Sequence, residues 1–173
     1  CGLAGVLWYQ GESNAGRAYE HAMLFPFMIE QWRKEWGQGS FPFYWVQLAD
    51  FMAEKPEPGE SNWAELRETQ TRTLRLPNTG MAICIDVGDK DVHGPIKAPI
   101  GQRLARLALV RTYGRPGESS GPLFASATVE GQAMRIRFSH TGAGLAARDG
   151  QPLRHFTIAG PDKNFLPADA KID

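Results

Sequence analysis

The chain of 173 residues carries 19 basic and 19 acidic side chains, so its formal net charge at pH 7 is zero. A balanced chain lacks the basic surface that binds nucleic acid or anionic membranes, and no apolar run is long enough to span a bilayer. We therefore expect no nucleic-acid partner and no membrane partner. The length and the apolar content suit a packed globular protein with one full core, or one core and part of another.

Three apolar runs in the first two thirds of the chain are each followed by a segment with helical periodicity. The runs are rich in β-branched and aromatic residues, which is typical of buried strands. On the first helix, Leu24, Met28 and Trp32 form the apolar stripe that we expect to face the core. The predicted strand and helix pairs occupy residues 5–9 and 14–36, 43–48 and 63–74, and 81–85 and 99–113.

Successive strand and helix pairs predict an α/β fold with parallel strands joined by right-handed crossovers. The carboxyl ends of such strands share one edge of the sheet, which is where ligands bind in α/β proteins. Polar residues follow each predicted strand, at positions 10–14, 47–50 and 86–93. We therefore expect one candidate site at this edge.

The pattern changes after residue 114. Residues 115–122 are rich in Gly, Pro and Ser, which is typical of a linker. Two alternating runs, 124–129 and 133–138, flank a short turn and predict a β-hairpin. We expect residues 1–114 to form a partial α/β domain and residues 123–173 to form the start of a β-sandwich domain.

Only one of the four histidines is a strong catalytic candidate. His21 lies on a predicted helix, and His140 and His155 lie in the β segment, so we expect structural or surface roles for these three. His93 follows a predicted buried strand and has three aspartates close in sequence. A neutral imidazole can take a proton from a hydroxyl nucleophile, and a carboxylate on its other nitrogen fixes the tautomer. The alternatives for His93 are a metal ligand or a solvated loop residue, and the spacing of the carboxylates argues against metal.

The cysteines predict neither a disulfide framework nor catalysis. Cys84 lies in an apolar strand pattern and is expected to be a small buried residue. Ser13 is the strongest candidate nucleophile within the chain, because Gly11 to Ala15 is one glycine short of the G-x-S-x-G elbow of hydrolases. The alternative is that Ser13 and Asn14 cap the following helix.

An ordered series of short blocks runs along the chain: LWYQGESNA at 7–15, FPFY at 41–44, VQLA at 46–49, LRE at 66–68 with Gln70, PNTGMA at 77–82, DVGD at 86–89, DVH at 91–93, HTG at 140–142 and IAG at 158–160. This series resembles the bacterial sialate O-acetylesterases, an SGNH-type family of carbohydrate esterases. The resemblance covers essentially the whole chain. It implies an SGNH or flavodoxin-like fold, with a three-layer parallel sheet of which this chain holds a part.

The resemblance also implies an activity, which is removal of O-acetyl groups from sialic acid or related acetylated sugars by a Ser-His-Asp triad, without metal or nucleotide. His93 would be the base and Asp91 its orienting acid, with Asp86 and Asp89 as alternatives. The block that lines the oxyanion and substrate site would be Gln10, Gly11, Glu12, Ser13 and Asn14. Gly94 and Ile96 stand where the family usually has Pro and Asn, which predicts reduced or altered activity.

The family's nucleophilic serine lies in a Gly-Gln-Ser-Asn-Met block that this sequence lacks. The resemblance therefore implies a piece truncated at both ends, whose missing N-terminal part supplies the nucleophile, and a secreted or periplasmic location. Two other functions stay open. One is a self-sufficient hydrolase that uses Ser13, and the other is a non-catalytic carbohydrate-binding protein with Trp8, Tyr44, Trp45 and Trp63 as stacking faces.

Overall fold

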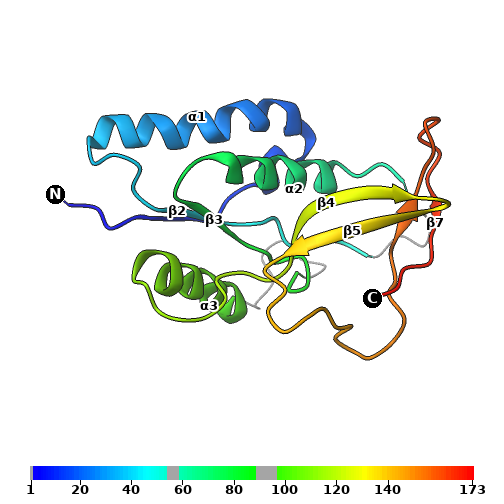
Figure 1. The fold of residues 1–173 in the computed structure, drawn as a ribbon. Helices are drawn as coiled ribbons and strands as arrows, with labels where there is room; N and C mark the ends of the chain where they lie inside the picture. The colour runs from blue at the N-terminus through cyan, green and yellow to red at the C-terminus, as the bar shows by residue number, and fades with distance from the viewer. Residues whose placement is uncertain (1, 54–58, 89–96) are drawn as a thin grey trace. The chain divides into compact units, whose positions relative to one another are not determined.

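The structure is a computed structural model that describes residues 2–53, 59–88 and 97–173. The chain divides into two compact units. The first consists mainly of residues 2–53 and 61–121, and the second mainly of residues 122–173. The candidate site lies in the first unit, whose elements are labelled in Figure 1.

A three-stranded parallel sheet forms the centre of the first unit. Its strands are β1 (Val6–Trp8), β2 (Phe43–Val46) and β3 (Thr79–Ala82), in the order β1-β2-β3. In the register, Tyr44 of β2 pairs with Leu7 on one side and with Gly80 on the other. The predicted parallel sheet is therefore confirmed, although each strand is shorter than its apolar run and β3 begins two residues before its predicted start.

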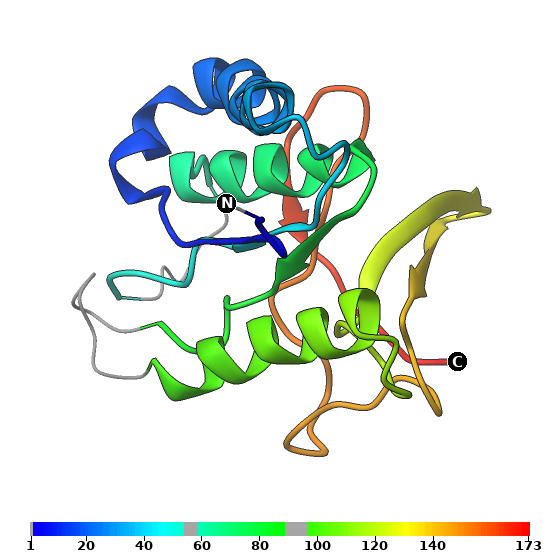
Figure 2. The same ribbon diagram turned by 90° about the vertical axis from the view of Figure 1, so that its left-hand side faces the viewer.

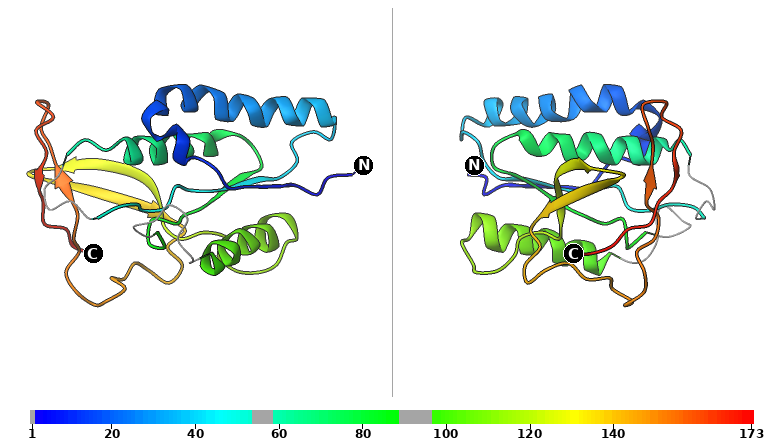
Figure 3. Two further views of the ribbon diagram at one scale, coloured as in Figure 1. Left: turned by 180° about the vertical axis from the view of Figure 1, so that it is seen from behind. Right: turned by 45° about the vertical axis from the view of Figure 1, so that its right-hand side comes forward.

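Helices cover both faces of this sheet. Helix α1 (Ala18–Trp36) follows the short 3₁₀ helix η1 (Glu12–Arg17), and α2 (Asn62–Arg72) continues into η2 (Thr73–Arg75). Helix α3 (Ala98–Leu107) ends in the π-helical turn η3 (Ala108–Thr112). Figures 1 and 2 show α1 and α2 on one face and α3 on the other, and the views in Figure 3 agree. The first unit therefore has the predicted three layers.

The core lies on both sides of β2, all of whose residues are buried. Phe43 and Trp45 contact Phe25 of α1, with ring centroids 6.3 and 5.2 Å away. Tyr44 and Val46 point to the other face and pack in a cluster with Ile100, Leu104 and Leu107. Because successive side chains of a strand point to opposite faces, a strand that is apolar at every position must be covered on both sides.

The predicted inner stripe of α1 is wrong at Leu24, whereas Trp32 faces the sheet as predicted and its ring centroid lies 6.0 Å from that of Phe43. Leu24 is 59% exposed, and the inner face instead carries His21, Phe25, Ile29 and Arg33. Arg33 is buried because its guanidinium donates hydrogen bonds of 2.8 and 3.2 Å to the carbonyl oxygen of Phe41. A periodicity analysis places charged residues outside, so a buried arginine moves the predicted stripe to the wrong face.

Two helix ends carry the residue types that favour them. Ser61 is the N-cap of α2, and its hydroxyl accepts a hydrogen bond of 3.2 Å from the backbone N–H of Ala64. Gly37 ends α1 in the left-handed conformation, with φ of 64°. None of the helices in the described ranges is long and apolar enough to cross a membrane.

The second unit contains only short antiparallel sheets in its described part. Strands β4 (Leu123–Glu130) and β5 (Ala133–Ser139) form the predicted hairpin, with a bulge between Phe124 and Ser126. Strands β6 (Thr157–Ile158) and β7 (Leu166–Pro167) form a separate pair. The hairpin is confirmed, whereas the β-sandwich stays a prediction.

The buried and exposed faces of α1 can be compared in a stability test. Ile29 is fully buried, so Ile29→Ala is expected to lower the free energy of unfolding by about 2–5 kcal/mol. Leu24→Ala, on the exposed face of the same helix, is expected to change it by about 0.5 kcal/mol or less. Urea denaturation of both variants measures the two changes, and a larger loss for Leu24→Ala would restore the predicted stripe.

A second test measures how the free energy of unfolding depends on pH through His21. Burial lowers the pKa of His21, whose Nδ1 lies 2.9 Å from the hydroxyl of Thr69. The folded state thus favours the neutral ring, so this contribution is present above the unfolded pKa of about 6.5 and is lost as the pH falls below it, by at most about 1.4 kcal/mol per pH unit. We expect His21→Gln to flatten the pH dependence of the unfolding free energy between pH 7 and 5. Parallel curves for the two proteins would contradict this expectation.

Candidate active site

The polar block after β1 forms a compact turn at the carboxyl edge of the sheet. The backbone N–H of Asn14 donates to the carbonyl oxygen of Gly11 at 2.8 Å, and the side-chain amide of Gln10 donates to Oδ1 of Asn14 at 2.6 Å. Gly11 occupies the N-cap position of η1, and no side chain caps that helix or α1. The capping role predicted as the alternative for Ser13 and Asn14 is therefore wrong.

Gln70 of α2 ties this turn to the end of β2. The side chain is 1% exposed, its Oε1 accepts from the backbone N–H of Leu48 at 2.8 Å, and its Nε2 donates to the carbonyl oxygen of Val46 at 3.4 Å. A Cβ at the buried Gly11 would lie 3.2 Å from Nε2 of Gln70. Gln70 was predicted only as part of the family's LRE block, although an amide four residues after the inward Leu66 indicates that the helix buries a polar group.

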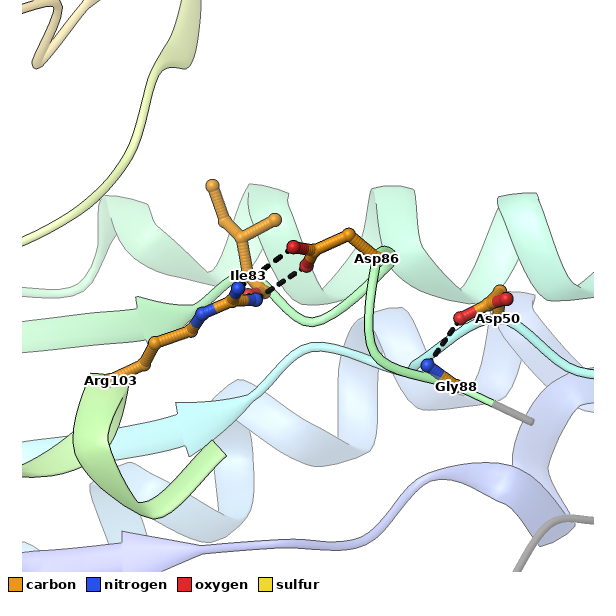
Figure 4. A network of polar contacts seen from close by, with 5 residues as sticks. All are labelled: Asp50, Ile83, Asp86, Gly88 and Arg103. Atoms are coloured by element: carbon orange, nitrogen blue, oxygen red, sulfur yellow. Dashed lines mark hydrogen bonds and ion pairs between the residues drawn. The ribbon is translucent and has the colours of Figure 1, made fainter. Parts of the chain in front are cut away.

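The segment that follows β2 is fixed by Trp63 of α2. The indole N–H of Trp63 donates to the carbonyl oxygen of Ala49 at 2.8 Å, and its ring stacks on Phe51 with centroids 5.0 Å apart. Asp50 lies between these two contacts. Its Oδ1 accepts a hydrogen bond of 2.5 Å from the backbone N–H of Gly88, in the turn after β3 (Figure 4).

The same turn is engaged by Arg103 of α3. The guanidinium donates to both carboxylate oxygens of Asp86, at 2.5 and 2.8 Å, and to the carbonyl oxygen of Ile83 at 2.5 Å. The hydrogen bond to Asp86 raises the pKa of Arg103. Figure 4 shows that Arg103 reaches from α3 to the end of β3.

Arg67 of α2 contributes charge near Asp50. Burial lowers the pKa of Arg67, and the charge of Asp50 opposes that lowering. Its Nη1 atom is buried and has no hydrogen-bond partner among the residues that the structure describes. Asp50 therefore has a half-buried cation nearby as well as the N–H of Gly88.

His93 and Asp91, the predicted base and acid, lie outside the described residues, as does Asp89. Both described neighbours of the segment 89–96 contact residues at the carboxyl edge. Gly88 bonds to Asp50, and Nζ of Lys97 donates to the hydroxyl of Tyr9 at 3.2 Å and lies 5.2 Å from its ring centroid. Polar residues that follow all three strands therefore meet at one edge.

The aromatic residues considered as sugar-stacking faces are not free platforms. Tyr44 and Trp45 are 2% and 0% exposed. One face of Trp63 is covered by Phe51, and Trp8 packs edge-on against Trp32 with centroids 5.7 Å apart. These contacts assign the aromatic residues to the packing of the first unit.

Cys84 and the possible metal ligands add no catalytic group to the described part of the site. Cys84 is free and fully buried, as expected, and burial raises the pKa of its thiol. Within residues 2–53, 59–88 and 97–173, no three His, Cys, Asp or Glu side chains are grouped so that they could hold a metal ion.

The parallel sheet between helical layers, with polar turns at its carboxyl edge, has the architecture of an SGNH-like carbohydrate esterase. A family of carbohydrate esterases, described as sialic acid-specific acetylesterases, matches residues 2–109. The chain belongs to this family.

Two curated relatives illustrate the similarity. The sialate O-acetylesterase of Mus musculus is 35% identical over 141 residues, and that of Homo sapiens is 33% identical over the same length. Each alignment covers 70% of this chain, but only 26% and 27% of the relatives. The chain thus spans about a quarter of the length of these proteins.

A solved structure extends the similarity to nearly every residue. The crystal structure of a carbohydrate acetylesterase from Xanthomonas citri is 43% identical, with a TM-score of 0.92. The match covers 99% of this chain and 40% of that one. The α/β class and the SGNH-like parallel sheet expected from the sequence are confirmed by this match.

The close approach of Gly88 to Asp50 gives a third test. A Cβ at Gly88 would lie 1.9 Å from the backbone oxygen of Asp50, whereas one at Gly101 of α3 would meet no atom within 4 Å. We expect Gly88→Ala to destabilise the protein by about 1–3 kcal/mol, and Gly101→Ala to stabilise it by up to about 1 kcal/mol. Thermal unfolding of both variants measures the difference, and equal midpoints would contradict the contact.

Proposed function

We propose that the protein to which this chain belongs removes O-acetyl groups from sialic acid or a related acetylated sugar. Family membership supports the reaction class. The observation that carries the proposal is the anchoring of both neighbours of the segment with His93, Gly88 on Asp50 and Lys97 on Tyr9, beside the Gln10 to Asn14 turn. A base on that segment would serve a substrate bound at this edge.

In the proposed mechanism His93 is the general base and Asp91 is the carboxylate that orients it. The nucleophilic serine attacks the acetyl carbonyl carbon while His93 takes its proton, and the tetrahedral intermediate collapses as His93 protonates the leaving sugar oxygen, which departs as a hydroxyl. Water then repeats the cycle on the acetyl-enzyme and releases acetate. His93 supplies the two proton transfers that each half of the reaction requires.

The oxyanion would be stabilised by donors of the turn after β1. The side-chain amide of Gln10 has two N–H groups, of which one bonds to Asn14, and the backbone N–H of Gly11 lies beside it in sequence. Loss of one such donor typically raises the barrier by about 3–4 kcal/mol. Glu12 and Ser13 complete the proposed substrate-binding block.

The contacts of Arg103 bear on which aspartate orients His93 in the proposed triad. Both carboxylate oxygens of Asp86 accept hydrogen bonds from that guanidinium, and the two side chains are 28% and 32% exposed. A carboxylate in a bidentate pair is poorly available to a histidine. This pairing supports Asp91, with Asp89 as the alternative.

We propose that the nucleophilic serine lies in a part of the protein outside these 173 residues, because none of the serines here lies in the family's Gly-Gln-Ser-Asn-Met block. Ser13 is exposed, and no histidine in the described part of the chain makes a hydrogen bond with it. The secreted or periplasmic location implied by the family remains part of the proposal.

The proposal is tested first through His93. The full-length protein is expected to hydrolyse a chromogenic acetate ester and an O-acetylated sialic acid, and His93→Ala is expected to lower kcat by about 10²- to 10⁴-fold because general-base help is lost. His155→Asn in the second unit is the matched control, and we expect it to keep the wild-type rate. Full activity of His93→Ala would refute the proposed function.

The nucleophile is located by a fluorophosphonate, which labels activated serines. We expect mass spectrometry of the full-length protein to find the label on a serine outside this chain and to find Ser13 unmodified. A label on Ser13 would instead support the self-sufficient hydrolase. Calorimetric binding of the acetylated sugar without turnover would favour a binding protein.

A further inference from the structure

The turn after β3 leaves the sheet before it reaches the proposed catalytic segment. Strand β3 ends at Ala82, so the ladder of backbone hydrogen bonds does not fix Asp86 to Gly88. Two side chains from other elements contact this turn instead. Arg103 reaches it from α3, and Asp50 reaches it from the segment after β2 (Figure 4).

Arg103 holds the first part of the turn with its whole guanidinium. It forms two hydrogen bonds with the carboxylate of Asp86 and a third with the carbonyl oxygen of Ile83. A planar guanidinium that bonds to a carboxylate at two points fixes the orientation of both groups, which a lysine ammonium cannot do. The contact therefore fixes the backbone direction at the end of β3.

Asp50 holds the last part of the turn. Its Oδ1 accepts from the N–H of Gly88 at 2.5 Å, and its backbone is fixed on one side by the Trp63 hydrogen bond to Ala49. The absence of a side chain at Gly88 allows this contact, since a Cβ there would overlap the backbone of Asp50.

We propose that Arg103 and Asp50 are positioning residues for the esterase reaction, which hold the turn Asp86 to Gly88 so that the chain enters the segment with His93 from a fixed point. This inference rests on the proposed function. His93 follows Gly88 by five residues. A displacement of about 1 Å at a catalytic group can lower the rate about 10²-fold, so the two contacts matter for kcat more than their exposed positions suggest.

Arg103 is tested in the full-length enzyme with Arg103→Met and Arg103→Lys. We expect Arg103→Met to lower kcat on the acetylated sugar about 10²-fold with KM changed less than about threefold. Arg103→Lys restores charge without the bidentate geometry and is expected to recover part of the rate. The matched control is Arg106→Met, an exposed arginine on the same helix, which we expect to keep wild-type kcat.

Asp50 is tested with Asp50→Ala and Asp50→Asn. Asparagine keeps an oxygen at the position that accepts from Gly88, so Asp50→Asn is expected to recover most of the kcat that Asp50→Ala loses. A general loss of packing would not be rescued in this way. Equal rates for the two variants would overturn the role assigned to Asp50.

A double-mutant cycle separates positioning from folding and from the proposed function itself. Rates are corrected for the folded fraction from each thermal unfolding curve. If Arg103 acts through His93, Arg103→Met lowers the residual rate of the His93→Ala enzyme less than about twofold. An equal loss in both backgrounds would overturn the positioning role, whereas wild-type activity of His93→Ala alone would overturn the proposed function.

Discussion

The complete burial of β2 is the constraint on which the rest of the first unit depends. Its side chains alternate between two faces, and Trp45 on one face and Tyr44 on the other are both removed from solvent. Such a strand is stable only with helices on both faces and a strand on each edge. Helices α1 and α2, which connect the strands in the order β1-α1-β2-α2-β3, cover one face, and α3 covers the other. The parallel pairing of the strands brings their carboxyl ends to one edge.

Where the hydrogen-bond ladders between strands end, polar side chains from the helices bond to the backbone groups that would otherwise lack partners. Arg33 of α1 bonds to the carbonyl oxygen of Phe41 before β2, and Gln70 of α2 bonds to the backbone after it. Arg103 of α3 bonds to the carbonyl oxygen of Ile83 after β3. Buried or half-buried backbone groups need partners, and these side chains supply them. The same contacts decide where the chain turns away from the sheet, so the residues that complete the fold also shape the edge at which the site is proposed.

The four aromatic residues considered as sugar-stacking faces, Trp8, Tyr44, Trp45 and Trp63, contribute to the packing of the first unit. Tyr44 and Trp45 are buried, and Trp63 is stacked on Phe51.

The sequence by itself determined the types and order of the elements in the first unit, the parallel sheet, the hairpin of the second unit and the family, because these follow from local periodicity, turn residues and short ordered motifs. It also determined that residues 10–14 lie at the carboxyl edge, whereas the roles of His93 and Asp91 stay predictions. Only the tertiary structure decided which face of α1 is buried, that Gln70 closes the end of β2, and that Arg103 pairs with Asp86. Each of these depends on a partner that lies far away in sequence, and a periodic pattern records how polar a residue is without recording which distant group will satisfy it.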